Sequence, residues 1–116
     1  MGGWEDLTMA TERKEKSRDD DVQQVRELLA REYQTSHASA RIDVYRQNSA
    51  SIRIRIIDPD FRGMNRVERD RPISQLLGQL PEMVESRITL LLLLTPEEQE
   101  MSLANFEFEH PVPSSI

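Results

Sequence analysis

Four arginines lie close together in the middle of the chain, where their side chains could bind acidic groups of a partner. They are Arg62, Arg66, Arg69 and Arg71. Guanidinium groups are planar and permanently charged, and they pair with carboxylates through two parallel hydrogen bonds. The segment therefore indicates a partner-binding loop that includes Asp70. The alternative is that Glu68 and Asp70 neutralise the arginines within the loop itself.

The carboxylates of the same region could in principle act as acid–base pairs. Asp58, Asp60, Glu68 and Asp70 lie close in sequence, and paired carboxylates can transfer protons. The chain offers no nucleophile next to a base and no phosphate-binding loop motif. Asp58 and Asp60 flank a proline, as turn residues often do. We therefore predict no catalytic residues and no enzymatic activity.

Metal and cofactor ligands are scarce. Without cysteine, the chain alone supplies no disulfide, thiolate zinc site or cysteine-bound iron–sulfur cluster. The two histidines, His37 and His110, are too few and too far apart to suggest a metal site. His37 falls in the polar segment 34–39, which is typical of a solvated linker. The sequence thus predicts no metal and no cofactor.

Length and charge further limit the class of protein to which this chain can belong. The chain has 116 residues, enough for one domain, and a net charge of −6 from 15 basic and 21 acidic residues. Such an acidic chain is untypical of a general nucleic-acid binder, although residues 41–71 carry eight arginines against five acids. The apolar run 90–94 is too short to span a membrane. With no secretory signal pattern at the start, we expect a cytoplasmic protein.

Hydrophobic periodicity predicts the elements that position these residues. Apolar residues at helical spacing predict a helix over 19–33, and alternation predicts two strands joined by a short link at 47–50. Asn65 is a plausible cap for a helix pair, 65–71 and 72–80, divided at Pro72. The apolar run 87–94 suits a buried strand. A last helix begins at Thr95, and its core-facing residues are expected to be Met101, Ala104 and Phe106.

This order predicts an α+β fold of the type αββααβ(α). It is a two-layer sandwich with a three-stranded mixed sheet and helices on one face, because a helical crossover makes the second and third strands parallel. We expect a disordered lead-in at 1–18, in which Trp4 is either solvated or a docking anchor, a domain over 19–113 and a tail at 114–116. The outer side of the third strand, expected at Leu91 and Leu93, needs cover from the tail or from another chain. The oligomeric state therefore stays open.

The element order and two motifs resemble the BolA family, whose fold is related to the type II KH domain. The segment 61–73 resembles the family pattern Phe-x-Gly followed by a basic stretch, with Phe61, Gly63, Val67, Arg69, Arg71 and Ile73 in register. Thr95-Pro96-Glu97-Glu98 is similar to the family's Thr-Pro-Glu-Glu after the last strand. The resemblance covers about residues 20–113. It implies a protein that binds a monothiol glutaredoxin.

The family's histidines are missing here. Asp70, Arg87 and Ser51 stand where the family has histidine, and the loop at 47–50 is too short to carry the family's further ligand. In the family these ligands hold an iron–sulfur cluster shared with the glutaredoxin, and arginine has no lone pair with which to replace imidazole. We therefore do not expect cluster binding.

Two functions remain. The first is a non-catalytic BolA-like adaptor that binds a protein partner, for which a glutaredoxin-like protein is the candidate. Its expected contacts are Arg62, Arg66, Arg69, Asp70, Arg71 and Arg87. The alternative is KH-like nucleic-acid binding through Arg41, Arg53, Arg55 and Gly63, although this loop has one glycine where a KH loop has two.

Overall fold

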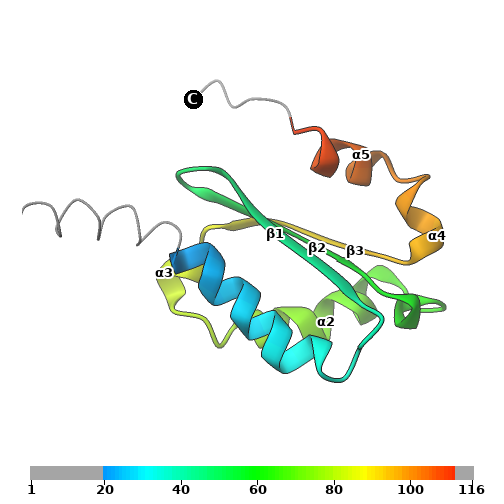
Figure 1. The fold of residues 1–116 in the computed structure, drawn as a ribbon, viewed down its shortest axis with the longest axis horizontal. Coiled ribbons are helices and arrows are strands. Elements are labelled where there is room, and N and C mark those ends of the chain that lie inside the picture. Colours follow the sequence, from blue (N-terminus) through cyan, green and yellow to red (C-terminus); the bar gives the residue numbers. More distant parts are fainter. Residues whose placement is uncertain (1–19, 112–116) are drawn as a thin grey trace, which may run out of the picture.

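The computed structural model describes residues 20–111. The expected lead-in, with Trp4, and the tail at 114–116 lie outside this range. Three strands form one sheet in the order β1 (Arg41–Asn48), β2 (Ser51–Ile57), β3 (Ile88–Leu94). β1 and β2 are antiparallel, whereas β2 and β3 are parallel (Figure 1). The predicted α+β fold with a three-stranded mixed sheet is confirmed.

A long N-terminal helix packs on one face of this sheet. Residues 20–29 are α-helical, and the helix continues as one π-helical segment, η1 (Ala30–Gln34). Its buried apolar side chains are those of the predicted stripe: Val22, Val25, Leu28, Leu29 and Tyr33. Tyr33 is therefore held against the core near the end of the helix, where the chain turns toward β1.

The second helix is longer and more regular than predicted. α2 (Arg66–Leu77) is one continuous helix with Pro72 inside it, so the expected division at this proline is wrong. A proline removes a single main-chain donor, and packing of Ile73 and Leu77 holds the helix together across it. Asn65 caps the helix as predicted, in a reciprocal pair with Glu68. α3 (Glu82–Glu85) follows after Pro81 and was not predicted.

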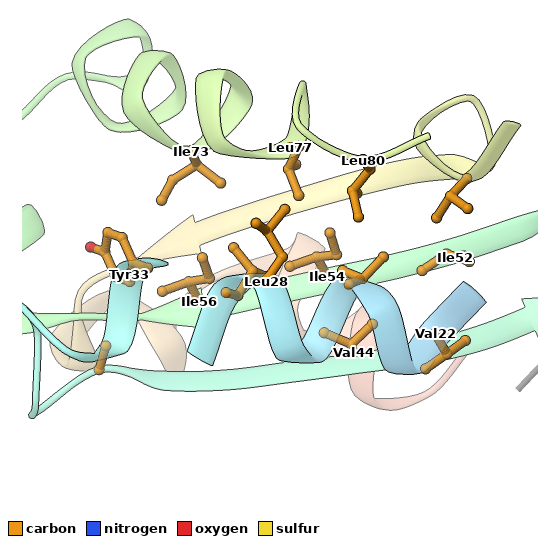
Figure 2. Packing of buried hydrophobic residues seen from close by; sticks show 14 of the residues in the cluster. Val22, Leu28, Tyr33, Val44, Ile52, Ile54, Ile56, Ile73, Leu77 and Leu80 are labelled. Carbon is orange, nitrogen blue, oxygen red and sulfur yellow. The ribbon is translucent and has the colours of Figure 1, made fainter. Parts of the chain in front are cut away.

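The main core lies between the sheet and these helices. Figure 2 shows Leu28 of the N-terminal helix and Ile73, Leu77 and Leu80 from the α2 side converging on the isoleucines of β2. Ile52, Ile54 and Ile56 have no solvent-exposed surface. The alternating pattern of β2 therefore marks its buried face as predicted.

A register shift changes which leucines of β3 face this core. Ile52 pairs with Ile88, but Arg53 pairs with Leu90, so that Thr89 is an extra residue. Leu91 and Leu93 consequently pack against the main core, and Leu90, Leu92 and Leu94 face the opposite side of the sheet. The expectation that Leu91 and Leu93 form the outer apolar face is wrong.

The chain then returns over that opposite side. α4 (Pro96–Gln99) starts at Thr95 with the predicted capping pair to Glu98, and α5 (Leu103–Glu109) follows from the cap Ser102. The buried residues of α5 are Asn105 and Phe108. The expected core residues of this segment, Met101, Ala104 and Phe106, are all exposed.

α5 covers part of the outer face of the sheet. Phe108 packs with Leu92 and Leu94, and its carbonyl accepts a hydrogen bond of 2.9 Å from the Tyr45 hydroxyl. The N-terminal helix, α2 and α3 lie on one side of the sheet, and α5 lies on the other (Figure 1). The expectation that helices cover only one face of the sheet is therefore wrong. Within residues 20–111, no helix combines the length and the apolar character needed to cross a bilayer.

Candidate functional site

The arginine loop is held in place by acidic residues at the start of α4. Arg62 Nε donates to Glu97 Oε1 over 2.9 Å, and both side chains are more than half exposed. The hydrogen bond from Arg62 holds the pKa of the Glu97 carboxyl below its usual value. Gly63, next in the loop, has a φ of +79°, a backbone conformation that favours glycine.

Arg69 is the most constrained of the predicted partner-binding residues. Its guanidinium donates to Glu98 Oε1 over 2.6 Å, to the Met64 carbonyl over 2.9 Å and to the Leu93 carbonyl over 3.2 Å. The same group lies 5.7 Å from the ring centroid of Phe61. The bond from Arg69 also lowers the pKa of Glu98. Arg69 therefore fastens α2 to β3 and α4, and it is not a freely exposed contact residue.

A groove runs along β3 beside these charges. It has a volume of about 680 Å³ and is bordered by the leucines 90–94, by Arg66, Arg69 and Asp70 of α2, and by Glu98, Ser102 and Ala104. Three residues of the predicted partner surface thus meet at one place. Arg66 is exposed, and Asp70 accepts a hydrogen bond of 2.6 Å from Ser74.

The groove follows the outer edge of the sheet. β3 is the last strand in the order β1-β2-β3, and the Leu94 carbonyl accepts from the main-chain N–H of Asp58. Because main-chain groups alternate in direction along a strand, those of Leu91 and Leu93 point away from β2 and toward the groove. The bond from Arg69 to the Leu93 carbonyl agrees with this direction.

The remaining predicted partner residues lie apart from the groove. Arg71 is exposed on α2 but does not line it. Arg87 precedes β3, at the end of the strand opposite to the Arg69 contact, and it forms an ion pair with the largely buried Asp21. The six predicted residues therefore do not form one surface.

The arginines proposed for nucleic-acid binding are committed to contacts within the chain. Arg55 is 3% exposed, donates to Asp43 Oδ2 over 2.8 Å and to Asn105 Oδ1 over 2.7 Å, and lies 4.8 Å above the Phe108 ring. Arg41 is 3.4 Å from Asp43, and Arg53 is half-buried. This face of the sheet is covered by α5 and is not the open basic surface that the alternative expects.

A second polar cluster lies at the far end of the N-terminal helix. His37 Nδ1 is 2.8 Å from Asp60 Oδ2 and 3.2 Å from Asp58 Oδ2. The Tyr33 hydroxyl also donates to Asp58, whose side chain has no exposed surface. Burial and the bond to Asp58 raise the pKa of Tyr33. The interpretation of His37 as a solvated linker residue is therefore wrong.

This cluster borders a cavity of about 530 Å³ between the N-terminal helix and α2. His37 and Asp60 contribute polar groups to its wall, and Tyr33, Phe61 and Leu76 contribute apolar surface. The three potential ligand atoms of His37, Asp58 and Asp60 all lie within 4.8 Å of one another. The arrangement could hold a small cation.

Sequence reasoning missed this cluster because its members come from two distant segments. The available signals were the four-residue spacing of Tyr33 and His37 and the acidic pair that flanks Pro59. Neither signal indicates that the two segments meet.

No family model matches the chain, and comparisons with curated proteins and with solved structures give no significant match.

Proposed function

We propose that this chain is a non-catalytic adaptor that binds a protein partner in an extended conformation along the outer edge of β3. The observation that carries the proposal is the groove of about 680 Å³ beside that edge. Main-chain groups of Leu91 and Leu93 are directed into it, so that a partner strand could add to the sheet. Its pairing at Leu93 would have to share or displace the hydrogen bond from Arg69 to the Leu93 carbonyl.

The walls of the groove also fit such a partner. Leu90, Leu91 and Leu93 are only partly buried and offer apolar surface to alternate side chains of an extended segment. Arg66 and Arg69 lie on the α2 side, with Asp70 and Glu98 nearby. Charges of both signs at the rim favour one register and orientation of a bound segment over others.

The resemblance to BolA proteins suggests a monothiol glutaredoxin as the first partner to test. In this proposal the adaptor works in the cytoplasm and supplies no iron–sulfur ligand of its own, since Arg87 and Ser51 stand at the family's histidine positions. Nucleic-acid binding has weaker support, because Arg55 is buried beneath α5.

A matched pair of charge reversals tests the site. Arg66→Glu and Arg71→Glu change the same charge on two exposed residues of α2, but only Arg66 lines the groove. A third variant, Ala104→Arg, places a long side chain into the groove from an exposed position. Each variant is compared with wild type by affinity purification from the native cell and quantitative mass spectrometry, and by calorimetry against a purified glutaredoxin.

The proposal expects Arg66→Glu and Ala104→Arg to reduce recovery of a specific partner at least tenfold, while Arg71→Glu leaves it unchanged. Circular dichroism melts confirm that the variants are folded. An equal loss of partner recovery in Arg66→Glu and Arg71→Glu would show that binding depends on the overall charge of α2 and not on the groove. Concentration-dependent dimerisation that Ala104→Arg abolishes would identify a second copy of the chain as the occupant.

A further inference from the structure

The cluster of His37, Asp58 and Asp60 holds more negative charge than the surrounding residues balance. Asp58 is completely buried and Asp60 lies beside it. Within residues 20–111, the ion pairs of both carboxylates are with His37 alone. A buried carboxylate is costly without a positive partner. One imidazole faces two carboxylates, of which Asp58 is buried and Asp60 is 64% exposed to solvent.

The distances from His37 Nδ1 to the two carboxylates are close to those between neighbouring ligands of a metal ion. Zinc and similar ions bind imidazole nitrogen and carboxylate oxygen at about 2.0–2.1 Å, so neighbouring ligand atoms are about 3.0–3.4 Å apart in octahedral or tetrahedral geometry. His37 Nδ1 is 2.8 Å from Asp60 Oδ2 and 3.2 Å from Asp58 Oδ2. A cation could enter between these atoms if the carboxylate oxygens of Asp58 and Asp60, which lie within 4.8 Å of each other, move to the spacing of neighbouring ligands.

Neighbouring residues already fix the orientation of these groups. The His37 ring stacks on the Tyr33 ring with centroids 4.1 Å apart and an angle of 4° between the planes. The Tyr33 hydroxyl donates to Asp58 Oδ2, and the main-chain N–H of Asp60 donates to Asp58 Oδ1 over 2.9 Å. Outer hydrogen bonds of this kind orient metal ligands and raise affinity.

We propose that His37, Asp58 and Asp60 form a binding site for one divalent transition-metal ion of the Zn²⁺ class. One imidazole and two carboxylates suit such borderline ions better than Mg²⁺ or Ca²⁺, which prefer oxygen ligands alone. His37 and Asp60 also line the cavity of about 530 Å³. The fourth position would therefore face this cavity and take water or an anionic ligand.

The test is metal binding to the full chain without a histidine tag. Isothermal titration calorimetry with Zn²⁺ gives stoichiometry and affinity, and Co²⁺ supplies a visible absorption spectrum that reports imidazole and carboxylate coordination. The central variant is Asp60→Asn, because the Asp60 side chain is 64% exposed and its replacement should not disturb the fold. His110→Ala is the matched control, since His110 is exposed and lies against Phe106, away from this cluster.

The proposal expects one Zn²⁺ per chain, at least tenfold weaker binding in Asp60→Asn and unchanged binding in His110→Ala. Tyr33→Phe keeps the ring but removes the hydroxyl, and it should weaken binding about tenfold. Zn²⁺ should raise the melting temperature of wild type and His110→Ala by more than that of Asp60→Asn at the same Zn²⁺ concentration. Equal Zn²⁺ affinity in wild type and Asp60→Asn would overturn the assignment, as would loss of Co²⁺ binding in His110→Ala.

Discussion

Docking of α5 can be tested with two phenylalanines that lie two residues apart on the same helix. Phe108 is 5% exposed and Phe106 is 60% exposed. The Phe108 ring lies edge-on to Tyr45, with centroids 4.9 Å apart, and beneath the Arg55 guanidinium. We predict that Phe108→Ala destabilises the native structure strongly, whereas Phe106→Ala has almost no effect.

The magnitude follows from these contacts. Truncation of a buried phenylalanine costs about 3–5 kcal/mol in a core. Here the cost has a ceiling, because α5 is a helix of seven residues that cannot persist alone in water. Once α5 has detached from the sheet, the loss of its remaining contacts does not destabilise the rest of the domain further. We therefore expect the free energy of unfolding to fall by about 2–4 kcal/mol in Phe108→Ala. In Phe106→Ala it should fall by less than about 0.5 kcal/mol, as for other surface substitutions.

Urea unfolding measures the two free-energy changes, and native-state hydrogen exchange shows where they act. In Phe108→Ala the amides of α5 should exchange rapidly while those of β2 stay protected. Arg55 would lose Asn105 but would keep Asp43 at 2.8 Å, so the sheet should remain folded. Equal free-energy changes for the two variants would refute the assigned face of α5.

Four other predictions address the arginine loop and the contact of Arg69 with Glu98. Phe61→Ala should cost about 3–5 kcal/mol in urea melts, since Phe61 is 2% exposed; a change within about 0.5 kcal/mol would contradict its place in the core. Gly63→Ala should cost about 1–2 kcal/mol through backbone strain alone, because a Cβ there meets no atom within 4 Å. Arg69→Glu should lower the melting temperature clearly, in contrast to Arg71→Glu, because it places like charge beside Glu98. Because the pKa of Glu98 is lowered from its ordinary value of 4.5, its contribution to stability is present above pH 4.5 and is lost as pH falls through the pKa of the folded state. Acid titrations of stability should therefore be shallower in Glu98→Gln.

Much of the fold was predictable because its signals are local. Asn65 caps α2, and Thr95 forms its capping pair with Glu98, as the sequence indicates. Alternation in β2 gives the buried face directly. Each of these features depends on residues within one turn or one strand, where spacing alone determines geometry.

The errors come from tertiary contacts. The extra residue at Thr89 reverses the faces of the following leucines, and a run of identical residues carries no pattern that reveals such a shift. The face of α5 is set by the pocket between Tyr45 and Arg55, since both Phe106 and Phe108 could fill it by composition. His37 meets Asp58 only because the N-terminal helix and β2 end side by side.

The exposed edge of β3 could cause aggregation, and it could also bind a partner strand. An apolar edge strand invites pairing with other chains, and the run from Leu90 to Leu94 is of this kind. Here Arg69 occupies the Leu93 carbonyl, and charged side chains of α2 and α4 border the groove. These groups oppose unselective pairing, since an approaching strand must either satisfy or displace them. A partner with complementary charges would gain the main-chain hydrogen bonds and keep the charges at the rim of the groove paired. The charged residues that oppose unselective pairing at this edge are therefore also suited to select the partner that binds there.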